Sequence, residues 1–567
     1  MAFRFVAHRI PANLALRSGS PIRFYSQAAA AFAAKANETQ QASKLSNPDP
    51  AEDSASAALV REHAPFMVAT YSRPSPVFVR AKGSYLWDME ERRYLDFTAG
   101  IAVTGLGHCD PQVSDILAEQ GSTLMHTSNL YYNPWTLALS KALVEKTVAS
   151  GGMHDAKSVF VCNSGSEANE AAIKFARKVG KVVDPSGNKT EIVSFANAFH
   201  GRTMGSLSAT HNPKYQEPFA PMVPGFKCGT YNDIAAIPDL VTEKTCGVIV
   251  EPIQGEGGVQ VATDDFMVAL AKRCREVGAL LIHDEIQCGM ARTGSLWAHG
   301  RLPKEAHPDM VTTAKALGNG FPIGAIIVNG HVTEKIKVGD HGTTYGGNPL
   351  ACRLAHHVLE RLSNPKLHES VMGKGAVLAR GLAQLRQKHS ELISEIRGRG
   401  LILGLQLTQD PAPIVAAARE RGLLIITAGH NTISNAARKK AGDARAGEVA
   451  LVPAERAVGN TAWEVRWPWA APTAVEYLEQ RSLTAGAPVG FYENQEGRQG
   501  QNSSRCLAGT INPSWLPSSH RDRISRWAAY DRYASILAEE LAVRRVGRYA
   551  SGDYVKAEVK TLTQKRY

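Results

Sequence analysis

The sequence predicts an α/β fold in which a mostly parallel sheet lies between layers of helices. Between about residues 60 and 430, short apolar runs rich in β-branched residues alternate with amphipathic helical stretches. These runs are apolar throughout, as strands covered on both faces are. The chain has 567 residues, more than one packed core normally requires, so we expect two or more domains.

Several strands can be assigned directly. The predicted sheet strands are Ser158–Cys162, Glu191–Phe195, Gly247–Val250 and Ala279–His283. From residue 367 we expect a long helix, a strand at Leu401–Leu407, a second helix and a strand over residues 423–427. This order predicts a large domain over residues 59–366 and a smaller, incomplete α+β domain over residues 367–432.

The two ends of the chain differ from its middle. Residues 1–26 carry four Arg and no acidic residue, and residues 23–26 resemble a mitochondrial processing site. We interpret this segment as a mitochondrial transit peptide, with a disordered arm as the alternative. Residues 27–58 are expected to be a flexible lead. Residues 433–567 lose clear periodicity, carry five of the eight Trp and have no assignable fold.

The net charge of +11 is concentrated at these ends. Residues 433–567 hold 20 Lys and Arg against 14 Asp and Glu, and with the four Arg of residues 1–26 this leaves +1 for residues 27–432. We therefore expect no nucleic-acid partner. No apolar run reaches about 18 residues, so no membrane association is expected. The eight Cys lack paired CxxC spacing, which predicts neither a disulfide scaffold nor a metal site.

The first candidate site lies where a predicted strand meets a helix. Gly165 and Ser166, in the run NSGSEAN, follow the strand Ser158–Cys162. Small residues at such a junction let backbone N–H groups and the positive helix end approach a phosphate. Taken alone, the run would more simply be a turn with Ser as the helix N-cap.

Two further residues suit pyridine and amine chemistry. Asp284 ends the strand ALLIH, at the sheet edge where parallel sheets place functional side chains. A carboxylate there can keep a pyridine nitrogen protonated and so make the ring an electron sink. Lys315 lies in the small, mostly apolar run TTAKALGNGFPIGA. Desolvation in such a setting lowers the lysine pKa and provides a neutral amine for a Schiff base.

The remaining candidates would bind and stack. Phe199 offers a ring for stacking, and Arg202 offers a planar fork for a carboxylate. Thr343 and Thr344 place two hydroxyls in a glycine-rich loop that suits a phosphate. A phosphate cradle, a pyridinium partner, a reactive lysine and a stacking ring together predict pyridoxal phosphate as the cofactor.

These motifs carry a family resemblance. In order, NSGSEANEAAIKFARK, FHGRT, EPIQGEGG, HDEIQCGMARTG, TTAKALGNGFPIGA and HGTTYGGNPLA resemble the class III aminotransferases of the ornithine/acetylornithine type, over about residues 65–432. The resemblance implies a fold type I pyridoxal-phosphate transferase and a homodimer with its site at the subunit interface. Within the class, NSGSEANE, FHGRT and HTSNLYYNP look more like acetylornithine aminotransferases than ornithine or γ-aminobutyrate aminotransferases.

The resemblance also implies roles for individual residues. Lys315 would form the Schiff base and move a proton, Asp284 would pair with the ring nitrogen, and Gln287 would contact the ring 3′-oxygen. The phosphate would be held by Gly165, Ser166 and Thr344, the last from a second subunit, with Phe199 on the ring. The substrate pocket would be formed by Arg202, which grips the far carboxylate, and by Thr343, Asn129 and Tyr132.

The implied reaction is a ping-pong transamination in the mitochondrial matrix, as a step of arginine biosynthesis. N2-acetyl-L-ornithine and 2-oxoglutarate would give N-acetyl-L-glutamate 5-semialdehyde and L-glutamate. The alternatives are an ornithine or other ω-amino acid aminotransferase, and a cofactor-binding but catalytically impaired structural or regulatory subunit.

The resemblance fails after residue 432. Family members normally continue with an arginine and a closing strand, and neither is recognisable here. That arginine normally binds the 2-oxoglutarate α-carboxylate and pairs with the glutamate at Glu256, which implies that Glu256 has lost its partner. Smaller departures are Cys288, Ala291 and Asp110, where Thr, Gly and His are commoner. We interpret residues 433–567 as an altered C-terminus, such as retained intron or shifted-frame coding; a basic, Trp-containing interaction module is the alternative.

Overall fold

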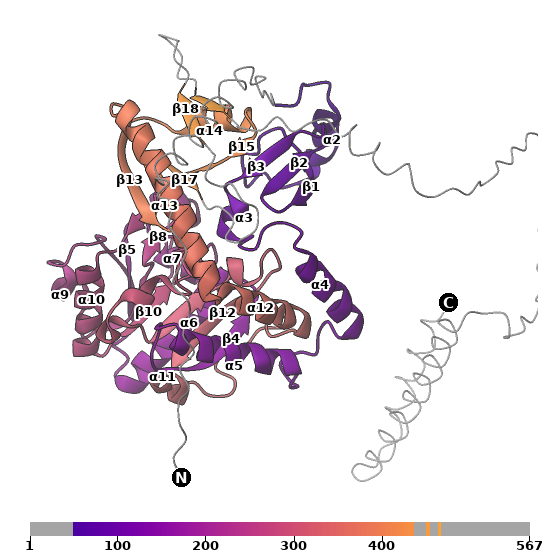
Figure 1. The fold of residues 1–567 in the computed structure, drawn as a ribbon. Coiled ribbons are helices and arrows are strands. Elements are labelled where there is room, and N and C mark those ends of the chain that lie inside the picture. The colour runs from indigo at the N-terminus through magenta and orange to yellow at the C-terminus, as the bar shows by residue number, and fades with distance from the viewer. Residues whose placement is uncertain (1–48, 436–449, 454–462, 467–567) are drawn as a thin grey trace, which may run out of the picture. The chain divides into compact units, whose positions relative to one another are not determined.

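The computed structural model describes residues 49–435, 450–453 and 463–466 (Figure 1). All of them belong to one compact unit that ends at Pro472. The predicted transit peptide, most of the predicted lead and nearly all of the predicted tail lie outside the described residues. Among the residues that are described, no helix has the length and apolar character needed to cross a membrane.

A seven-stranded sheet forms the centre of this unit. In spatial order its strands are β4 (Ala156–Cys162), β12 (Gly324–Asn329), β11 (Met310–Thr313), β10 (Leu280–Asp284), β7 (Thr245–Val250), β5 (Glu191–Phe195) and β6 (Phe226–Gly229). The five strands from β11 to β6 are parallel, whereas β12 pairs antiparallel with both of its neighbours. The predicted mostly parallel sheet is therefore confirmed, and all four assigned strands are present. The strand predicted at 279–283 begins and ends one residue later, so Asp284 is its last residue.

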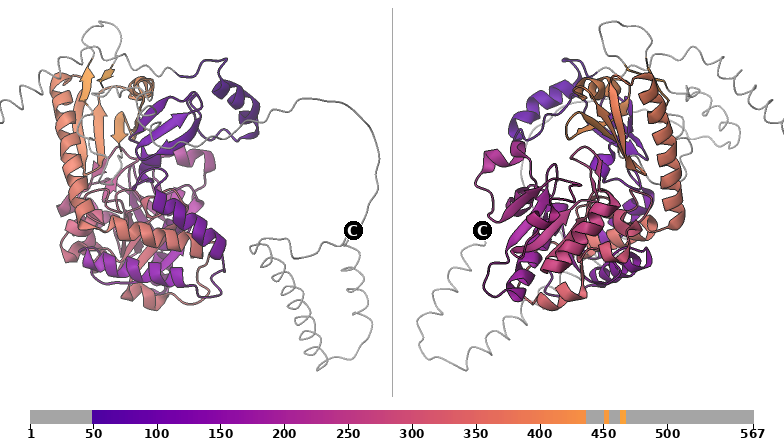
Figure 2. Two further views of the ribbon diagram at one scale, coloured as in Figure 1. Left: turned by 45° about the vertical axis from the view of Figure 1, so that its right-hand side comes forward. Right: turned by 90° about the vertical axis from the view of Figure 1, so that its left-hand side faces the viewer.

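Helices cover both faces of this sheet (Figure 2). Successive strand side chains point to opposite faces, so Ile282 packs in one apolar core and Leu281 in another. The first core is closed by α6 and the second by α10, while α5 and α12 close a third core near β4. The helices of these layers are α4 (Pro111–Thr123), α5 (Pro134–Ala149), α6 (Gly165–Val183), α10 (Asp264–Val277) and α12 (Pro349–Leu362).

Two smaller sheets accompany the central one. An antiparallel sheet contains β13 (Ile393–Arg399), β14 (Ile402–Leu407), β17 (Thr432–Asn435) and β16 (Ile426–Ala428), and packs against α13 (Pro365–Lys388) and α14 (Ala412–Arg419). The other contains β1 (Phe78–Lys82), β2 (Tyr85–Asp88), β3 (Arg93–Asp96) and β15 (Leu423–Leu424). The pairing of β3 with β15 joins the first strands of the chain to its later part.

Shorter elements connect these layers. They are α2 (Ala55–His63), α3 (Ala99–Ala102), α7 (Met204–Ala209), α8 (Pro213–Gln216), α9 (Ile237–Leu240), α11 (Gly330–Lys335), the strand pair β8 (Ile253–Gln254) and β9 (Gln260–Val261), and the strand pair β18 (Ala450–Pro453) and β19 (Trp463–Arg466).

Three features differ from the sequence-based expectation. First, β17 crosses the boundary predicted at residue 433, and Ile433 is buried beside β14 because the strand pairing continues through it. Second, β13 was not predicted, since its polar residues gave no apolar run. Third, α2 begins inside the predicted flexible lead, and Asp49 in that lead pairs with Arg419 at 2.6 Å.

Candidate active site

A cavity of about 310 Å³ lies beyond the carboxyl ends of the parallel strands. Asp284 ends β10, while Glu251, His200 and Lys315 come shortly after the ends of β7, β5 and β11. Carboxyl ends of parallel strands meet at one edge of a sheet, which is why residues so far apart in the chain line one cavity. The same cavity is lined by Asn163 to Ser166, where β4 leads into α6.

Asp284 is held at the floor of this cavity by three hydrogen bonds. Its Oδ2 accepts from His200 Nδ1 and from Asn169 Nδ2, each at 2.8 Å, and its Oδ1 accepts from the Ile286 backbone at 3.0 Å. All of its side chain but 3% is removed from solvent. Because the carboxylate accepts from His200, the imidazole carries its proton on Nδ1. Asp284 is thus a fixed, buried acceptor beside the cavity.

Lys315 contributes an amine to the same space. Burial lowers its pKa, while the carboxylates of Asp284 and Glu251 act in the opposite direction. The backbone of Lys315 has φ 43°, in the left-handed region, where a residue other than glycine pays about 1–3 kcal/mol. A strained backbone of this kind persists only when the surrounding structure holds it, so the packing around Lys315 fixes where its side chain begins. Burial also raises the pKa of Glu251 well above its usual range, and Asp284 adds to the rise.

Small residues shape the cavity wall where α6 begins. A Cβ on Gly165 would come within 2.8 Å of Ile286, and one on Gly201, at φ 136°, would come within 2.3 Å of Ser166 Oγ. The first N–H groups of a helix have no partner within the helix, and the helix end is positive. Side chains larger than glycine could therefore not be accommodated at Gly165 or Gly201. These two positions form the wall where the phosphate cradle at Gly165 and Ser166 was predicted.

Gln287 and Phe199 line the cavity as well. Gln287 fits because Gly255 has no side chain: a Cβ there would lie 2.0 Å from Gln287 Oε1. The Phe199 backbone donates to Glu251 Oε1 at 2.9 Å, which fixes the ring at the cavity. The structure thus brings together Gly165, Ser166, Phe199, Asp284, Gln287 and Lys315, six of the predicted site residues.

Glu256 has a hydrogen-bond partner, contrary to the expectation from the missing arginine. The Tyr215 hydroxyl donates to Glu256 Oε1 at 2.7 Å. The guanidinium carbon of Arg202 lies 3.7 Å from the centre of the Tyr215 ring and 5.3 Å from that of Phe199. Arg202 is therefore stacked beside the cavity residue Phe199, with its guanidinium exposed.

The other predicted pocket residues divide into two pairs. The Asn129 amide donates to the Thr343 carbonyl at 3.1 Å, and Asn163 Nδ2 donates to Thr343 Oγ1 at 3.2 Å. Asn129 and Thr343 are thus connected to the cavity wall through Asn163. Tyr132 and Thr344 are exposed and do not line the cavity of their own chain.

Two departures from the usual motifs have structural explanations. Both carboxylate oxygens of Asp110 accept from Arg361, at 2.8 and 3.0 Å, so this acid connects the start of α4 to α12. Cys288 is fully buried, and its thiol donates to Glu285 Oε2 at 3.3 Å. Ala291 has φ 65°, in the left-handed region that favours glycine, so the alanine occupies a backbone position that the commoner glycine adopts without strain.

Comparison with known proteins identifies the family. The model of the class-III aminotransferases matches residues 67–438. The chain belongs to the class-III aminotransferases. It is 69% identical over 433 residues to a Neurospora crassa protein named mitochondrial acetylornithine aminotransferase, a match that covers 76% of this chain and 93% of the relative.

Solved structures of this class share the fold. A Toxoplasma gondii ornithine aminotransferase has a TM-score of 0.63 and 31% identity, covering 68% of this chain and 90% of its own. An N-acetylornithine aminotransferase from Stenotrophomonas maltophilia has a TM-score of 0.57 and 36% identity, covering 68% and 94%. The predicted family, fold and enzyme class are therefore confirmed.

Class-III aminotransferases act on small molecules with pyridoxal phosphate as cofactor, and this aminotransferase has residues that fit it. The wall at Gly165 and Ser166 suits the phosphate, and Asp284 suits a protonated ring nitrogen. His200 Nε2 is buried and has no hydrogen-bond partner among the described residues. Buried polar atoms normally have a partner, so this nitrogen fits a site that receives a polar ligand. Lys315 supplies the amine.

Sequence reasoning missed four residues of this aminotransferase site. They are Asn169 and His200, which hold Asp284, Glu251, which lines the cavity, and Tyr215, which holds Glu256. The motifs NSGSEAN, FHGRT and EPIQGEGG contain the first three, so a search for buried polar partners within the motifs would have found them. Tyr215 lies outside every motif.

Proposed function

We propose that this aminotransferase transfers the δ-amino group of N2-acetyl-L-ornithine to 2-oxoglutarate, giving N-acetyl-L-glutamate 5-semialdehyde and L-glutamate. The observation that carries the substrate assignment is the 69% identity to the Neurospora crassa acetylornithine aminotransferase, over 93% of that protein. The geometry supports the reaction class, because a buried carboxylate and a desolvated lysine line one cavity.

Lys315 is proposed as the catalytic base and acid. Pyridoxal phosphate, when bound, supplies an electron sink that stabilises negative charge on the substrate carbon that carries the amino group. The neutral amine of Lys315, favoured by its lowered pKa, takes the proton from that carbon and can return it. Asp284, held in place by His200 and Asn169, offers a fixed carboxylate acceptor to the ring nitrogen.

The remaining predicted residues are proposed to bind. Gly165 and Ser166 hold the cofactor phosphate, Gln287 the ring 3′-oxygen, and Phe199 stacks on the ring. Arg202 binds the far carboxylate of acetylornithine with its exposed fork. Thr343, Asn129 and Tyr132 line the substrate pocket, and Glu256 borders it.

We also propose a homodimer. An exposed apolar surface contains Met125, Leu130, Tyr131, Tyr132 and Tyr345, each at least 58% accessible. Monomers rarely expose such a patch, and Thr344 adjoins it. In a symmetric dimer this surface would be covered, and Thr344 would reach the cofactor phosphate of the partner. Light scattering of the purified protein and of Tyr131→Glu tests this: a wild-type monomer would contradict it.

The protein is proposed to act in the mitochondrial matrix, as a step of arginine biosynthesis. The support is the acid-free, arginine-containing segment of residues 1–26 and the mitochondrial name of the Neurospora crassa relative. N-terminal sequencing of protein recovered from mitochondria should show a start after residue 26. Recovery of the uncleaved chain from the cytosol would contradict it.

One experiment tests the function directly. N-acetylornithine is added to the protein loaded with pyridoxal phosphate while the cofactor absorbance is followed, and 2-oxoglutarate is then added. Loss and recovery of the absorbance are expected. Loss without recovery would mean that the keto-acid half-reaction is impaired, as the missing arginine would cause. No change with acetylornithine but a response to ornithine would transfer the assignment to an ornithine aminotransferase, and no response at all would favour a catalytically impaired subunit.

A further inference from the structure

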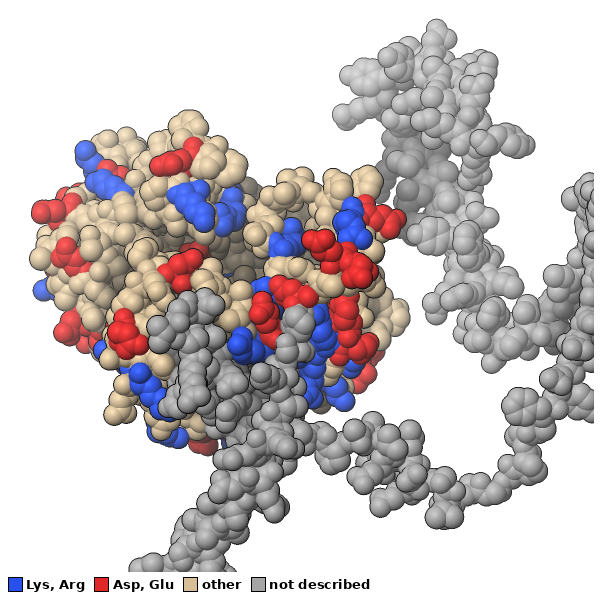
Figure 3. Space-filling model, turned by 90° about the horizontal axis from the view of Figure 1, so that it is seen from above, with Lys and Arg blue, Asp and Glu red and all other residues tan. Residues whose placement is uncertain are grey.

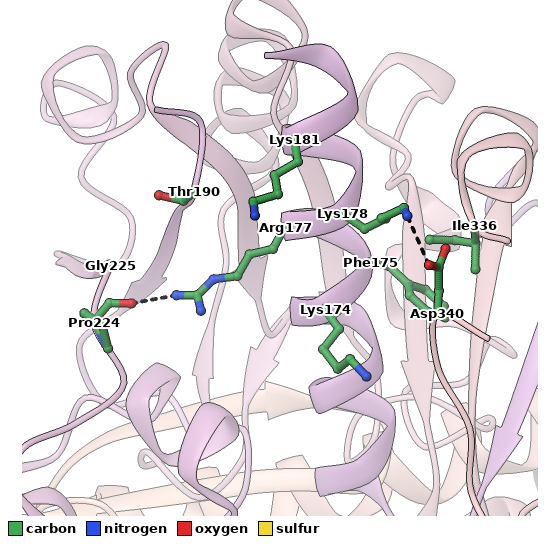
Figure 4. Close-up of a pocket in the computed structure, with 10 residues that line it drawn as sticks. All are labelled: Lys174, Phe175, Arg177, Lys178, Lys181, Thr190, Pro224, Gly225, Ile336 and Asp340. Atoms are coloured by element: carbon green, nitrogen blue, oxygen red, sulfur yellow. Dashed lines mark hydrogen bonds and ion pairs between the residues drawn. The ribbon is translucent and has the colours of Figure 1, made fainter. Parts of the chain in front are cut away.

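A second hollow lies along the outer face of α6, separate from the active-site cavity. Its volume is about 580 Å³, and it is lined by Lys174, Phe175, Arg177, Lys178, Lys181, Thr190, Pro224, Gly225, Ile336 and Asp340 (Figure 4). It shares no lining residue with the active-site cavity. Since a helix rises about 1.5 Å per residue, Lys181 lies roughly 24 Å along α6 from Gly165.

The charge of this hollow is one-sided. Lys174, Arg177, Lys178 and Lys181 recur at helical spacing on one face, against the single carboxylate of Asp340. On the face seen from above, by contrast, acidic and basic side chains lie next to one another (Figure 3). The charge between residues 27 and 432 sums to only +1, so this concentration of cations is local.

All four cations line the hollow, and three of them have partners within the protein. Lys178 pairs with Asp340 at 3.0 Å, and Lys174 Nζ lies 2.8 Å from His341 Nδ1. Lys181 has no hydrogen bond or ion pair with any residue the structure describes, and its ammonium points towards Arg177 (Figure 4). The positive charges of Lys181 and Arg177 repel each other, and an anion bound between them would offset this repulsion.

Arg177 is held in place for such an anion. Its Nη2 donates to the Pro224 carbonyl at 2.6 Å, and its guanidinium lies 5.4 Å from the centre of the Phe226 ring. Its Nε is buried with no hydrogen-bond partner among the described residues. Gly225, at φ 88°, leaves room for this position, because a Cβ there would approach Arg177 Nη2 at 3.3 Å. The guanidinium is therefore fixed by the protein with donor capacity left over.

We propose that this hollow binds a compound with a chain of two or three phosphates. A planar guanidinium and flexible ammonium groups are the side chains that bind phosphate best. Such a chain carries about three to four negative charges at pH 7, which matches four cations against one carboxylate. The volume lies within the range of about 300–1,000 Å³ typical of small-molecule sites. The compound is either an inorganic polyphosphate or a nucleoside di- or triphosphate.

Isothermal titration calorimetry tests the proposal on the enzyme loaded with pyridoxal phosphate, so that the cofactor's own phosphate site is filled. The probes are sodium tripolyphosphate and, separately, ATP without magnesium. Saturable binding of at least one probe is expected, at about one per chain. ATP binding more tightly than tripolyphosphate would assign the site to nucleotides, and the reverse order to inorganic polyphosphate.

A matched pair of double variants decides whether this hollow is the binding site. Arg177→Gln/Lys181→Gln should weaken binding at least about tenfold, because it removes two charge-assisted contacts. Lys272→Gln/Lys366→Gln removes the same net charge from exposed positions elsewhere and should change binding less than about twofold. Absence of saturable binding to the wild type, or an equal loss in both variants, would overturn the proposal. Cofactor absorbance checks that each variant is folded.

Discussion

The hydroxyl of Tyr215 donates a 2.7 Å hydrogen bond to Glu256, and the ring of Tyr215 carries the stacked guanidinium of Arg202. One side chain thus holds the two charged groups proposed to border the substrate. The family resemblance implies that this glutamate normally pairs with an arginine, which would follow the position of residue 432 in this chain. Here the tyrosine keeps the carboxylate paired and leaves Arg202 free for the substrate.

Replacing Tyr215 by Phe should raise KM for N-acetylornithine by about five- to tenfold while kcat changes less than about twofold. The ring still stacks on Arg202, but Glu256 loses its donor and can attract Arg202 away from the substrate carboxylate. Steady-state kinetics measure this effect. Tyr71→Phe, at a position 70% exposed, is the control and should change neither constant. A fall in kcat at unchanged KM would contradict the positioning role.

Replacing Lys315 by Ala should lower the transamination rate by about 10³-fold, because no other described lysine lines the cavity. The wall at Gly165 and Ser166 and the carboxylate of Asp284 remain, so the cofactor should still bind, with an altered absorbance spectrum. Single-turnover kinetics and spectra of Lys315→Ala and of the control Lys272→Ala test this. Activity within tenfold of the wild type would exclude Lys315 as the base.

Two ion pairs of different burial should differ in their contribution to stability. Arg361→Gln leaves the carboxylate of Asp110, only 2% exposed, without its bidentate partner and should lower the free energy of unfolding by about 3 kcal/mol. Arg80→Gln breaks a pair with Glu91 whose partners are 51% and 70% exposed, and should cost under about 1 kcal/mol. Urea unfolding of both variants measures the difference. Equal losses would show that the Asp110 contact is dispensable.

Stability should fall as the pH is lowered below about 6.5, and His283 is one cause. Its ring is buried with no hydrogen-bond partner at either nitrogen among the described residues. Burial, and then the neighbouring charges of His299 and His307, lower its pKa well below the usual value. The folded state therefore stays neutral while the unfolded chain takes up a proton, so each pH unit below this range costs up to about 1.4 kcal/mol.

Replacing His283 by Phe should remove this contribution. The difference in free energy of unfolding between pH 7.5 and pH 5.5 should then be smaller than in the wild type, as urea titrations at the two pH values would show. The exposed His331→Phe is the control and should retain the wild-type difference. An unchanged difference in His283→Phe would mean that other groups, such as His307, dominate.

Much of the fold and of the cavity could be predicted because the relevant signals are local. Apolar runs mark strands whatever surrounds them, and β4, β5, β7 and β10 were found in this way. Asp284 and the NSGSEAN run directly follow such strands, and a parallel sheet collects strand ends at one edge. Knowing the strands was therefore enough to expect Gly165 and Asp284 at one edge. Lys315 follows β11, which was not predicted, so its place rested on its small, apolar motif instead.

The contacts that were missed join distant parts of the chain. Tyr215 and Glu256 are 41 residues apart, and Asp110 and Arg361 are 251 apart. Neither pair leaves a trace in local periodicity, because each residue is an ordinary polar residue in its own segment. The same holds for β15, which completes a sheet formed by the much earlier strands β1, β2 and β3.

The sequence by itself determined the family, the parallel core and six of the residues that line the active-site cavity, since these depend on short motifs and on periodic burial. Only the tertiary structure decided that the strand β17 continues past residue 432 and that Tyr215 is the partner of Glu256. It also decided that four cations of α6 face one hollow. The physical reason is that such contacts are set by the relative placement of elements, which packing fixes only when the whole core has assembled.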